Sequence, residues 1–191
     1  MKRIFLSAAL LIAAGSTMCV AGTLEGKVST GNSVVYVDAI PGKTFPAPTK
    51  TVLVSQRGLK FVPPLVVIQR GTIVEFQNDD SVQHNVFWPS VGGSKKLAHN
   101  MGTWPKGDKR SFTFDHAGIV PLLCNVHPEM SGYIVVSPTP YFAQTDSAGN
   151  FKIDNIPDGK YTVVAWHEGS KPQSKSVDVS GTGKVDLALA Q

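Results

Sequence analysis

The sequence has no apolar run long enough to span a membrane, because a transmembrane helix needs about 20 predominantly apolar residues. Its longest apolar stretch, residues 4–14, is interrupted by Ser7. Lys2 and Arg3 precede this stretch, and small, weakly polar residues follow it. This order is typical of a signal peptide. We therefore expect residues 1–21 to be a signal peptide and the rest of the chain to be exported to the periplasm without a membrane span.

Cysteine is almost absent, since the chain has only Cys19 and Cys124. Cys19 lies in the predicted signal peptide, and residues 16–18 before it resemble a lipoprotein signal poorly, so we expect no lipid anchor there. Removal of the signal peptide leaves Cys124 as the one remaining thiol, which excludes an internal disulfide bond. A lone thiol in an oxidising compartment needs protection, either by burial in the core or by a bound metal.

Neither sign of charge dominates the composition. The predicted signal peptide holds two basic residues and no acidic residue, so 16 basic and 14 acidic residues remain. Nucleic-acid binding usually needs a clear excess of positive charge, so we expect no nucleic-acid partner. The sequence also shows no Ser/His/Asp set, phosphate-binding loop or pair of carboxylates at catalytic spacing, and we expect no enzyme.

Helical periodicity is missing as well, and short β-branched and aromatic runs alternate with turn residues instead. Apolar Val74 and Phe76 alternate with polar Glu75 and Gln77, as in a strand with one buried face. Many short strands separated by turns favour a β-sandwich. The expected strands include residues 34–37, 52–54, 65–68, 73–76, 111–114, 133–136, 151–153 and 161–166.

The most informative pattern is Cys124, His127 and Met130 in one short segment, with His84 located 40 residues before the cysteine. One thiolate, two imidazoles and one thioether form the ligand set of a blue-copper electron-transfer site. The sulfur ligands suit Cu(I) and the imidazoles also suit Cu(II), so one site can serve both oxidation states. The pattern predicts one copper ion bound by these four residues.

Other uses of Cys124 fit the pattern less well. A nucleophilic dyad with His127 needs an exposed thiol beside a base. Zinc would accept one cysteine and two histidines, but Met130 would then be unexplained. A binuclear copper centre needs two cysteines. Copper storage or delivery uses similar ligands and stays open, as does a structural or adhesion role for the whole chain.

The other three histidines lie in segments with weaker patterns. His116 is in a predicted turn and His99 is in a connection rich in Gly, Ser and Lys, so we expect both to be exposed. His167 ends a predicted strand. A surface position, an interface and a second metal site all remain open for His167.

Residues 51–137 resemble the cupredoxin family of blue-copper proteins. The sequences FVPP at 61–64, GTIVEFQNDD at 71–80 and HNV at 84–86 are similar to the strands that lead to the family's first histidine. The Cys-x-x-His-x-x-Met segment at 124–130 is similar to the short ligand loop of amicyanin-like members. The resemblance implies a Greek-key β-sandwich and one type 1 copper site with the ligands His84, Cys124, His127 and Met130.

The resemblance carries three further expectations. Asn85 ties the two ligand segments together by hydrogen bonds. The alternate positions before the cysteine, which are often aromatic in the family, are Val120 and Leu122 here. Pro121 between them predicts a strand edge or bulge, because proline lacks a ladder donor. His127 reaches the surface within an apolar patch that meets transient redox partner proteins. The candidate patch residues are Val126, Pro128, Phe87, Trp88 and Pro63.

Segments on either side of the cupredoxin-like region resemble a second family. The sequences GKV at 26–28, TDSAGNF at 145–151 and PDGKY at 157–161 are similar to the carboxypeptidase regulatory-like, or transthyretin-like, β-sandwich. The last two are rich in residues that favour tight turns. Since domain termini often lie close together, one domain can be inserted in another.

Two divisions of the chain follow from these patterns. In the first, residues 22–50 and 138–191 form the second sandwich and residues 51–137 are inserted in it. In the alternative, the cupredoxin spans 22–137 and residues 138–191 are a C-terminal appendage. Both predict an all-β protein with a small second sandwich. The expected function is the transfer of single electrons between redox partners.

Overall fold

The computed structural model describes residues 21–189. The predicted signal peptide lies outside these residues except for Ala21. Within them the chain forms strands and a short 3-10 turn, η1 (Lys95–Leu97). The expected all-β fold is therefore confirmed. No helix in the described part of the chain is long and apolar enough to cross a membrane.

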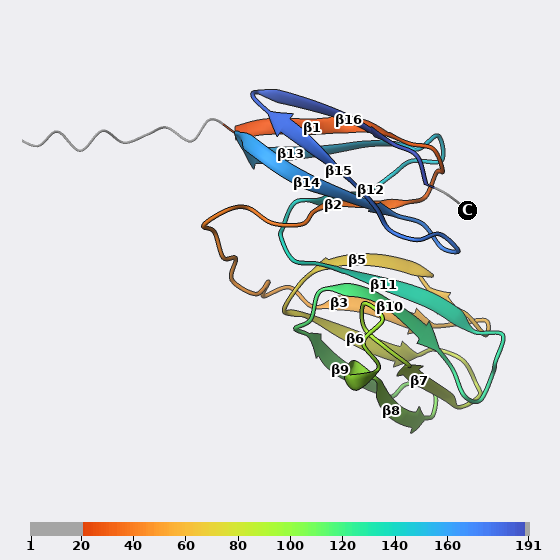
Figure 1. Cartoon of the computed structure of the whole chain (residues 1–191). Helices are drawn as coiled ribbons and strands as arrows, with labels where there is room; N and C mark the ends of the chain where they lie inside the picture. Colours follow the sequence, from red (N-terminus) through yellow and green to blue (C-terminus); the bar gives the residue numbers. More distant parts are fainter. Residues whose placement is uncertain (1–20, 190–191) are drawn as a thin grey trace, which may run out of the picture.

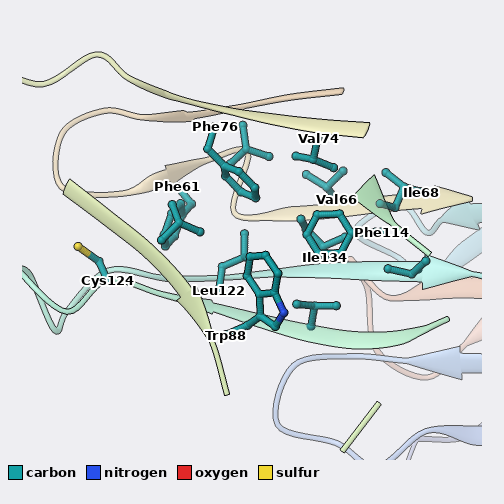
Figure 2. Close-up of a cluster of buried hydrophobic side chains, with 14 of the residues drawn as sticks. Phe61, Val66, Ile68, Val74, Phe76, Trp88, Phe114, Leu122, Cys124 and Ile134 are labelled. Atoms are coloured by element: carbon teal, nitrogen blue, oxygen red, sulfur yellow. The ribbon is translucent and has the colours of Figure 1, made fainter. Parts of the chain in front are cut away.

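The site sandwich, in the lower half of Figure 1, is built from strands β3 to β11. One of its sheets has the order β4-β3-β6-β9, and the other has the order β5-β11-β10-β7-β8. Large apolar side chains from both sheets, including Phe76, Trp88 and Leu122, fill the space between them (Figure 2). The strands are β3 (Val52–Gln56), β4 (Phe61–Val62), β5 (Leu65–Gln69), β6 (Thr72–Asn78), β7 (His84–Trp88), β8 (His99–Trp104), β9 (Lys109–Phe114), β10 (Gly118–Leu123) and β11 (Ser131–Ser137).

The second sandwich, in the upper half of Figure 1, combines strands from both ends of the described chain. Its sheets have the orders β13-β1-β16 and β12-β2-β14-β15. It has a core of its own, which includes Leu24, Val163 and Ile156. The strands are β1 (Ala21–Val28), β2 (Val34–Val37), β12 (Phe142–Gln144), β13 (Asn150–Pro157), β14 (Gly159–Trp166), β15 (Gln173–Val179) and β16 (Thr182–Leu187).

Each strand segment expected from the sequence lies within a strand of the structure. Strand β6 shows why the pattern is informative. Val74 and Phe76 are fully buried, whereas Ile73, which precedes Val74 and lies on the opposite face of the strand, is 40% exposed. Because β6 pairs with β3 on one side and β9 on the other, its backbone N–H and C=O groups have hydrogen-bond partners on both sides. The alternation of apolar and polar side chains then decides which face of the strand is buried.

The two sandwiches meet through a small apolar cluster. Val34 of β2 and Trp166 of β14 pack against Val135 of β11. The ring of Tyr133, also on β11, lies 5.0 Å from the ring of Trp166. The second sandwich therefore rests against β11, the strand that follows the segment from Cys124 to Met130.

Pro121 lies on the part of β10 that has a strand partner on one side. It pairs with Tyr133 of β11, whereas β10 pairs with β7 only between Leu123 and Phe87. On the side facing β7, the N–H of Gly92 donates to the carbonyl of Ile119 at 2.9 Å. The expected edge is thus local, within a strand that is internal to its sheet.

The turn between β3 and β4 contains Leu59 in a left-handed conformation, with φ of 57°. The other described non-glycine residues with positive φ are both asparagines, Asn32 and Asn155. A side chain with a Cβ pays roughly 1–2 kcal/mol in this region, and asparagine tolerates it best. The left-handed backbone of Leu59 therefore costs free energy of folding. Burial of its side chain offsets little of this cost, because the side chain is 39% exposed.

Replacing Leu59 with asparagine is expected to stabilise the protein by about 1 kcal/mol, because it relieves this cost. For a chain of this size that corresponds to a rise in melting temperature of about 2–4 °C. Calorimetry would measure the change. Val82→Asn is a matched control, since Val82 is 43% exposed and has no positive φ. Equal melting temperatures for the two variants would contradict the explanation.

Candidate metal centre

Two neighbouring strands and the segment that follows one of them bring three of the four predicted ligands together. His84 is the first residue of β7, and Cys124 directly follows the last residue of β10. The two strands pair at Leu123 and Phe87, which places the end of β10 beside β7. One donor atom each from His84, Cys124 and His127 lies within 4.8 Å of the others, forming the metal cluster of the described residues.

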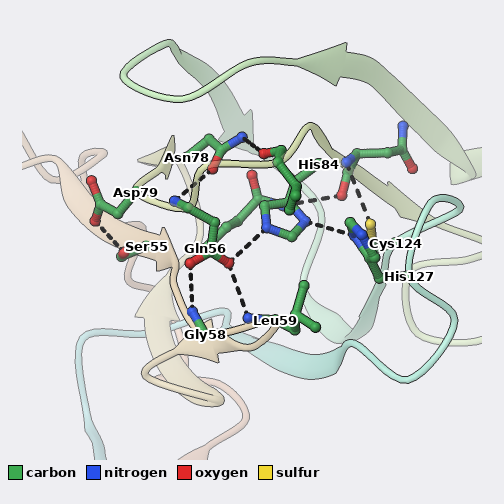
Figure 3. Close-up of polar contacts among 12 residues, drawn as sticks. Ser55, Gln56, Gly58, Leu59, Asn78, Asp79, His84, Cys124 and His127 are labelled. Carbon is green, nitrogen blue, oxygen red and sulfur yellow. Dashed lines mark hydrogen bonds and ion pairs between the residues drawn. The ribbon is translucent and has the colours of Figure 1, made fainter.

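The two imidazoles face each other through the same ring atom. Nδ1 of His84 lies 3.0 Å from Nδ1 of His127 (Figure 3). Two ligand atoms about 2 Å from one ion in a tetrahedral arrangement lie roughly 3.3 Å apart. The ring positions therefore suit joint binding of one ion through the two Nδ1 atoms.

Cys124 is buried, and its sulfur accepts a hydrogen bond from the backbone. The residue is 3% exposed and lies at one end of the core (Figure 2). The N–H of Asn85 donates to its Sγ at 3.4 Å. This hydrogen bond ties the sulfur to the backbone of β7, at the residue next to His84. Among the described residues Cys124 is a free cysteine, as the sequence predicted.

Met130 closes the segment that begins at Cys124. Its N–H donates to the carbonyl of His127 at 3.0 Å, so the chain turns between these two residues. The Met130 side chain is 1% exposed and belongs to the same core cluster as Cys124. The structure thus places the thioether in the core beneath the turn, on the same segment as two of the clustered donors.

The expected hydrogen-bonding role of Asn85 is confirmed. Its Oδ1 accepts from the N–H of Asn125, which directly follows Cys124, at 3.2 Å. Its Nδ2 donates to Oδ1 of Asn100 at 2.8 Å and to the carbonyl of Gly102 at 2.7 Å. One amide side chain therefore joins the start of β7, the Cys124 segment and β8.

Asp80 is a partner of the site that the sequence did not reveal. Its Oδ2 lies 2.8 Å from Nε2 of His84, a side chain that is fully buried. Burial raises the pKa of Asp80, but the N–H groups of Leu59 and Gly58 and the neighbouring His84 outweigh it, so its pKa falls to about 2. Asp80 is therefore an ionised acceptor at neutral pH.

The Asp80 contact assigns the proton on a neutral His84. A carboxylate only accepts, so Nε2 of His84 carries the hydrogen and Nδ1 holds the lone pair. The 3.0 Å contact between the rings then has Nδ1–H of His127 as its donor. His84 thus presents a lone pair toward Cys124 and His127, as a metal ligand must.

One member of the candidate apolar patch was assigned wrongly. Trp88 is 1% exposed, and its Nε1–H donates to the carbonyl of Leu97 at 3.1 Å. It lies on the same inward face of β7 as Val86, which explains its burial. Val126 is 46% exposed, and Pro63 and Pro128 are also exposed.

The remaining histidines lie apart from the cluster. His99 and His116 are exposed, as expected. The ring of His99 lies 5.2 Å from the ring of Trp88. His167 is half-buried, and its Nδ1 lies 2.7 Å from the carbonyl oxygen of Glu168.

An all-β sandwich with a Cys-His-His cluster, in which His84 and Cys124 are buried and His127 is half-buried, is characteristic of copper-binding cupredoxins. The family described as copper binding proteins of the plastocyanin/azurin family matches residues 48–137. Amicyanin of Paracoccus versutus is 31% identical over 90 residues, covering 47% of this chain and 67% of the relative. The chain belongs to the plastocyanin/azurin family of copper-binding proteins.

Solved structures and a second family also match. A reduced amicyanin variant is 26% identical, with 48% of this chain and 86% of that chain covered and a TM-score of 0.43. A purple cupredoxin from Nitrosopumilus maritimus is 26% identical, with 45% and 99% covered and a TM-score of 0.40. Residues 129–187 match domain II of polysaccharide lyase family 4. This match includes β12 to β16 but neither β1 nor β2. The resemblance of the second sandwich to the carboxypeptidase regulatory-like family stays a prediction.

Proposed function

We propose that this protein is an exported mononuclear blue-copper protein that carries single electrons between redox partners, and that it is not an enzyme. The observation that carries the proposal is the convergence of one ring nitrogen each of His84 and His127 and the sulfur of Cys124 within 4.8 Å of one another. His84, Cys124, His127 and Met130 would hold one type 1 copper ion. Bound copper supplies a Cu(I)/Cu(II) couple at this site.

The surroundings of the ligands suit an electron carrier. Cys124, Met130 and His84 are buried, so their positions are set by core packing. Asn85 and Asp80 hold the backbone and the imidazole by hydrogen bonds. Ligands held in place by packing and hydrogen bonds favour similar geometry in both oxidation states, which keeps rearrangement during electron transfer small.

The partner surface is proposed around His127, which is half-buried while its neighbours Val126 and Pro128 are exposed. Pro63 and Leu59 extend the exposed apolar surface on the β3–β4 side of the site. Transient redox encounters use small interfaces, and a few apolar side chains around one ligand suffice for them. A partner of this kind would approach the site through His127.

Titration of the purified protein with Cu(II) tests the proposal. A thiolate bound to Cu(II) gives an intense visible band, so we expect the colour to reach its maximum at one copper per chain. Paramagnetic spectra of the same samples should show one class of Cu(II). A colourless complex, or an endpoint at two or more ions, would contradict a mononuclear blue-copper site.

Copper storage or delivery is the competing function, because the same soft ligands bind Cu(I). The two are separated by mixing the Cu(I) form with a Cu(I) chelator and, separately, with an oxidised small redox protein. A carrier keeps its copper and loses its electron rapidly. Rapid loss of the metal to the chelator, with slow electron exchange, would support delivery instead.

We also propose that the site sandwich is an insertion in the second sandwich. Strands β1 and β2 precede β3 in the chain, and β12 to β16 follow β11. Thr139, between β11 and β12, donates to the carbonyl of Val37 at the end of β2 at 2.7 Å. The entry to and exit from the inserted segment therefore lie close together, as an insertion needs.

A further inference from the structure

Asp80 connects the candidate metal centre to the turn between β3 and β4. Its Oδ1 accepts from the N–H of Gly58 at 2.7 Å, and its Oδ2 accepts from the N–H of Leu59 at 3.0 Å. The same Oδ2 lies 2.8 Å from Nε2 of His84. Figure 3 labels the three donors to this carboxylate, Gly58 and Leu59 in the turn and His84 at the cluster. Three donors from two elements therefore hold one carboxylate.

The turn is shaped to bind an anion. Gly58 and Leu59 both have left-handed backbones, with φ of 65° and 57°. Successive N–H groups in such a turn point to the same side and form a concave site for negative charge. Leu59 adopts this conformation although a side chain with a Cβ disfavours it. The turn thus orients its two N–H groups toward Asp80 despite a backbone cost.

We propose that Asp80 is a positioning residue for the copper site, which fixes the imidazole of His84 and favours Cu(II) over Cu(I). The proposal rests on the proposed function. Through the bond to Nε2, the carboxylate keeps Nδ1 of His84 unprotonated and aimed at the cluster. Its negative charge attracts Cu(II) more strongly than Cu(I), because the interaction scales with the charge on the metal.

The neighbouring Asp79 offers a matched control. Its carboxylate accepts from Ser55 and, at 2.8 Å, from Nε2 of Gln77, and its hydrogen bonds involve no ligand of the site. Asp80→Asn and Asp79→Asn therefore remove the same charge from adjacent residues. In the Asp80 variant the amide oxygen can take the place of Oδ2, whereas the amide nitrogen cannot accept from the N–H of Gly58 in place of Oδ1. Asp79 also accepts through both of its oxygens, so each variant loses one negative charge and one acceptor with little change of shape.

Affinity for both copper ions and the reduction potential should be measured for the wild type and the two variants. We expect Asp80→Asn to weaken Cu(II) binding about tenfold, at the lower end of the effects typical of partners of metal ligands. Cu(I) binding should change little. A tenfold difference between the two oxidation states raises the potential by about 59 mV. Asp79→Asn should leave the affinities for Cu(II) and Cu(I) within about twofold of the wild type. Its reduction potential should shift by no more than a twofold change in affinity would cause.

A second measurement needs no copper. Nitrogen-15 resonances of the wild-type protein without metal report which ring nitrogen of His84 carries the hydrogen. We expect the Nε2–H form, with a slowly exchanging hydrogen. In Asp80→Ala both ring forms should become populated. A wild-type His84 that carries its hydrogen on Nδ1 would overturn the proposal.

The outcomes separate this inference from the function on which it rests. If the wild type gives no coloured copper complex, the proposed function fails. If the wild type gives one but Asp80→Asn and Asp79→Asn have equal affinities and potentials, the role of Asp80 fails and the function stands. Melting curves of both variants exclude a general loss of folding as the cause of weakened binding.

Discussion

Cys124→Ala is expected to abolish the visible band of the copper-loaded protein. The thiolate is the source of the charge-transfer colour, and neither imidazoles nor a thioether can replace it. Binding of Cu(II) should weaken at least 100-fold, since the site loses its one anionic sulfur ligand. The fold should survive at a cost of about 1 kcal/mol, comparable to removing one buried methyl group. Optical titration and circular dichroism measure the two effects.

His116→Ala is a suitable control for the Cys124 variant. It removes another metal-binding side chain, but His116 is exposed and lies outside the cluster. Its copper titration should match that of the wild type. A visible band that persists in Cys124→Ala, or disappears in His116→Ala, would mean that the coloured copper is bound elsewhere.

Trp88→Ala is expected to cost about 3–5 kcal/mol of folding stability, the range for truncating a large buried aromatic residue. Trp88 is 1% exposed and is among the largest fully buried side chains of the described residues. Its ring contacts Phe112 and Phe114, with centroid distances of 4.8 and 5.2 Å. Its Nε1–H bond to Leu97 would also be lost. Urea unfolding followed by circular dichroism measures the loss.

Leu53→Ala is the control for that prediction, because Leu53 is 50% exposed on the same sandwich. Surface truncations of this kind usually change stability by less than about 0.5 kcal/mol. Since the second sandwich has its own core cluster, its unfolding should shift less than that of the site sandwich in Trp88→Ala. Equal losses in the Trp88 and Leu53 variants would contradict the burial argument.

Much of the fold was predictable because it depends on local alternation. In β6, Val74 and Phe76 are buried as their spacing predicts, and β14 contains the predicted strand at residues 161–166. The clustering of His84, Cys124 and His127 followed from residue types whose chemistry is specific enough to imply a shared metal. The assignment of all four ligands, Met130 included, and the insertion of one sandwich in the other remain predictions.

Burial and contact at particular side chains were less predictable. Trp88 looked like a surface residue beside the ligands, but β7 directs it inward with Val86. Asp80 had no expected role, but it bonds His84 and two N–H groups of a turn that is distant in the sequence. Pairing between segments decides such contacts, and pairing leaves little trace in the local sequence.

The sequence by itself determined the all-β class and the presence, within the described residues, of one thiol with two histidines and a methionine at ligand spacing. These depend on residue types and short-range periodicity. Tertiary structure alone decided that the two Nδ1 atoms lie 3.0 Å apart, that Asn85 also bonds β8 through Asn100 and Gly102 and that Asp80 holds His84. Those features depend on strand register, which brings residues far apart in the chain within bonding distance.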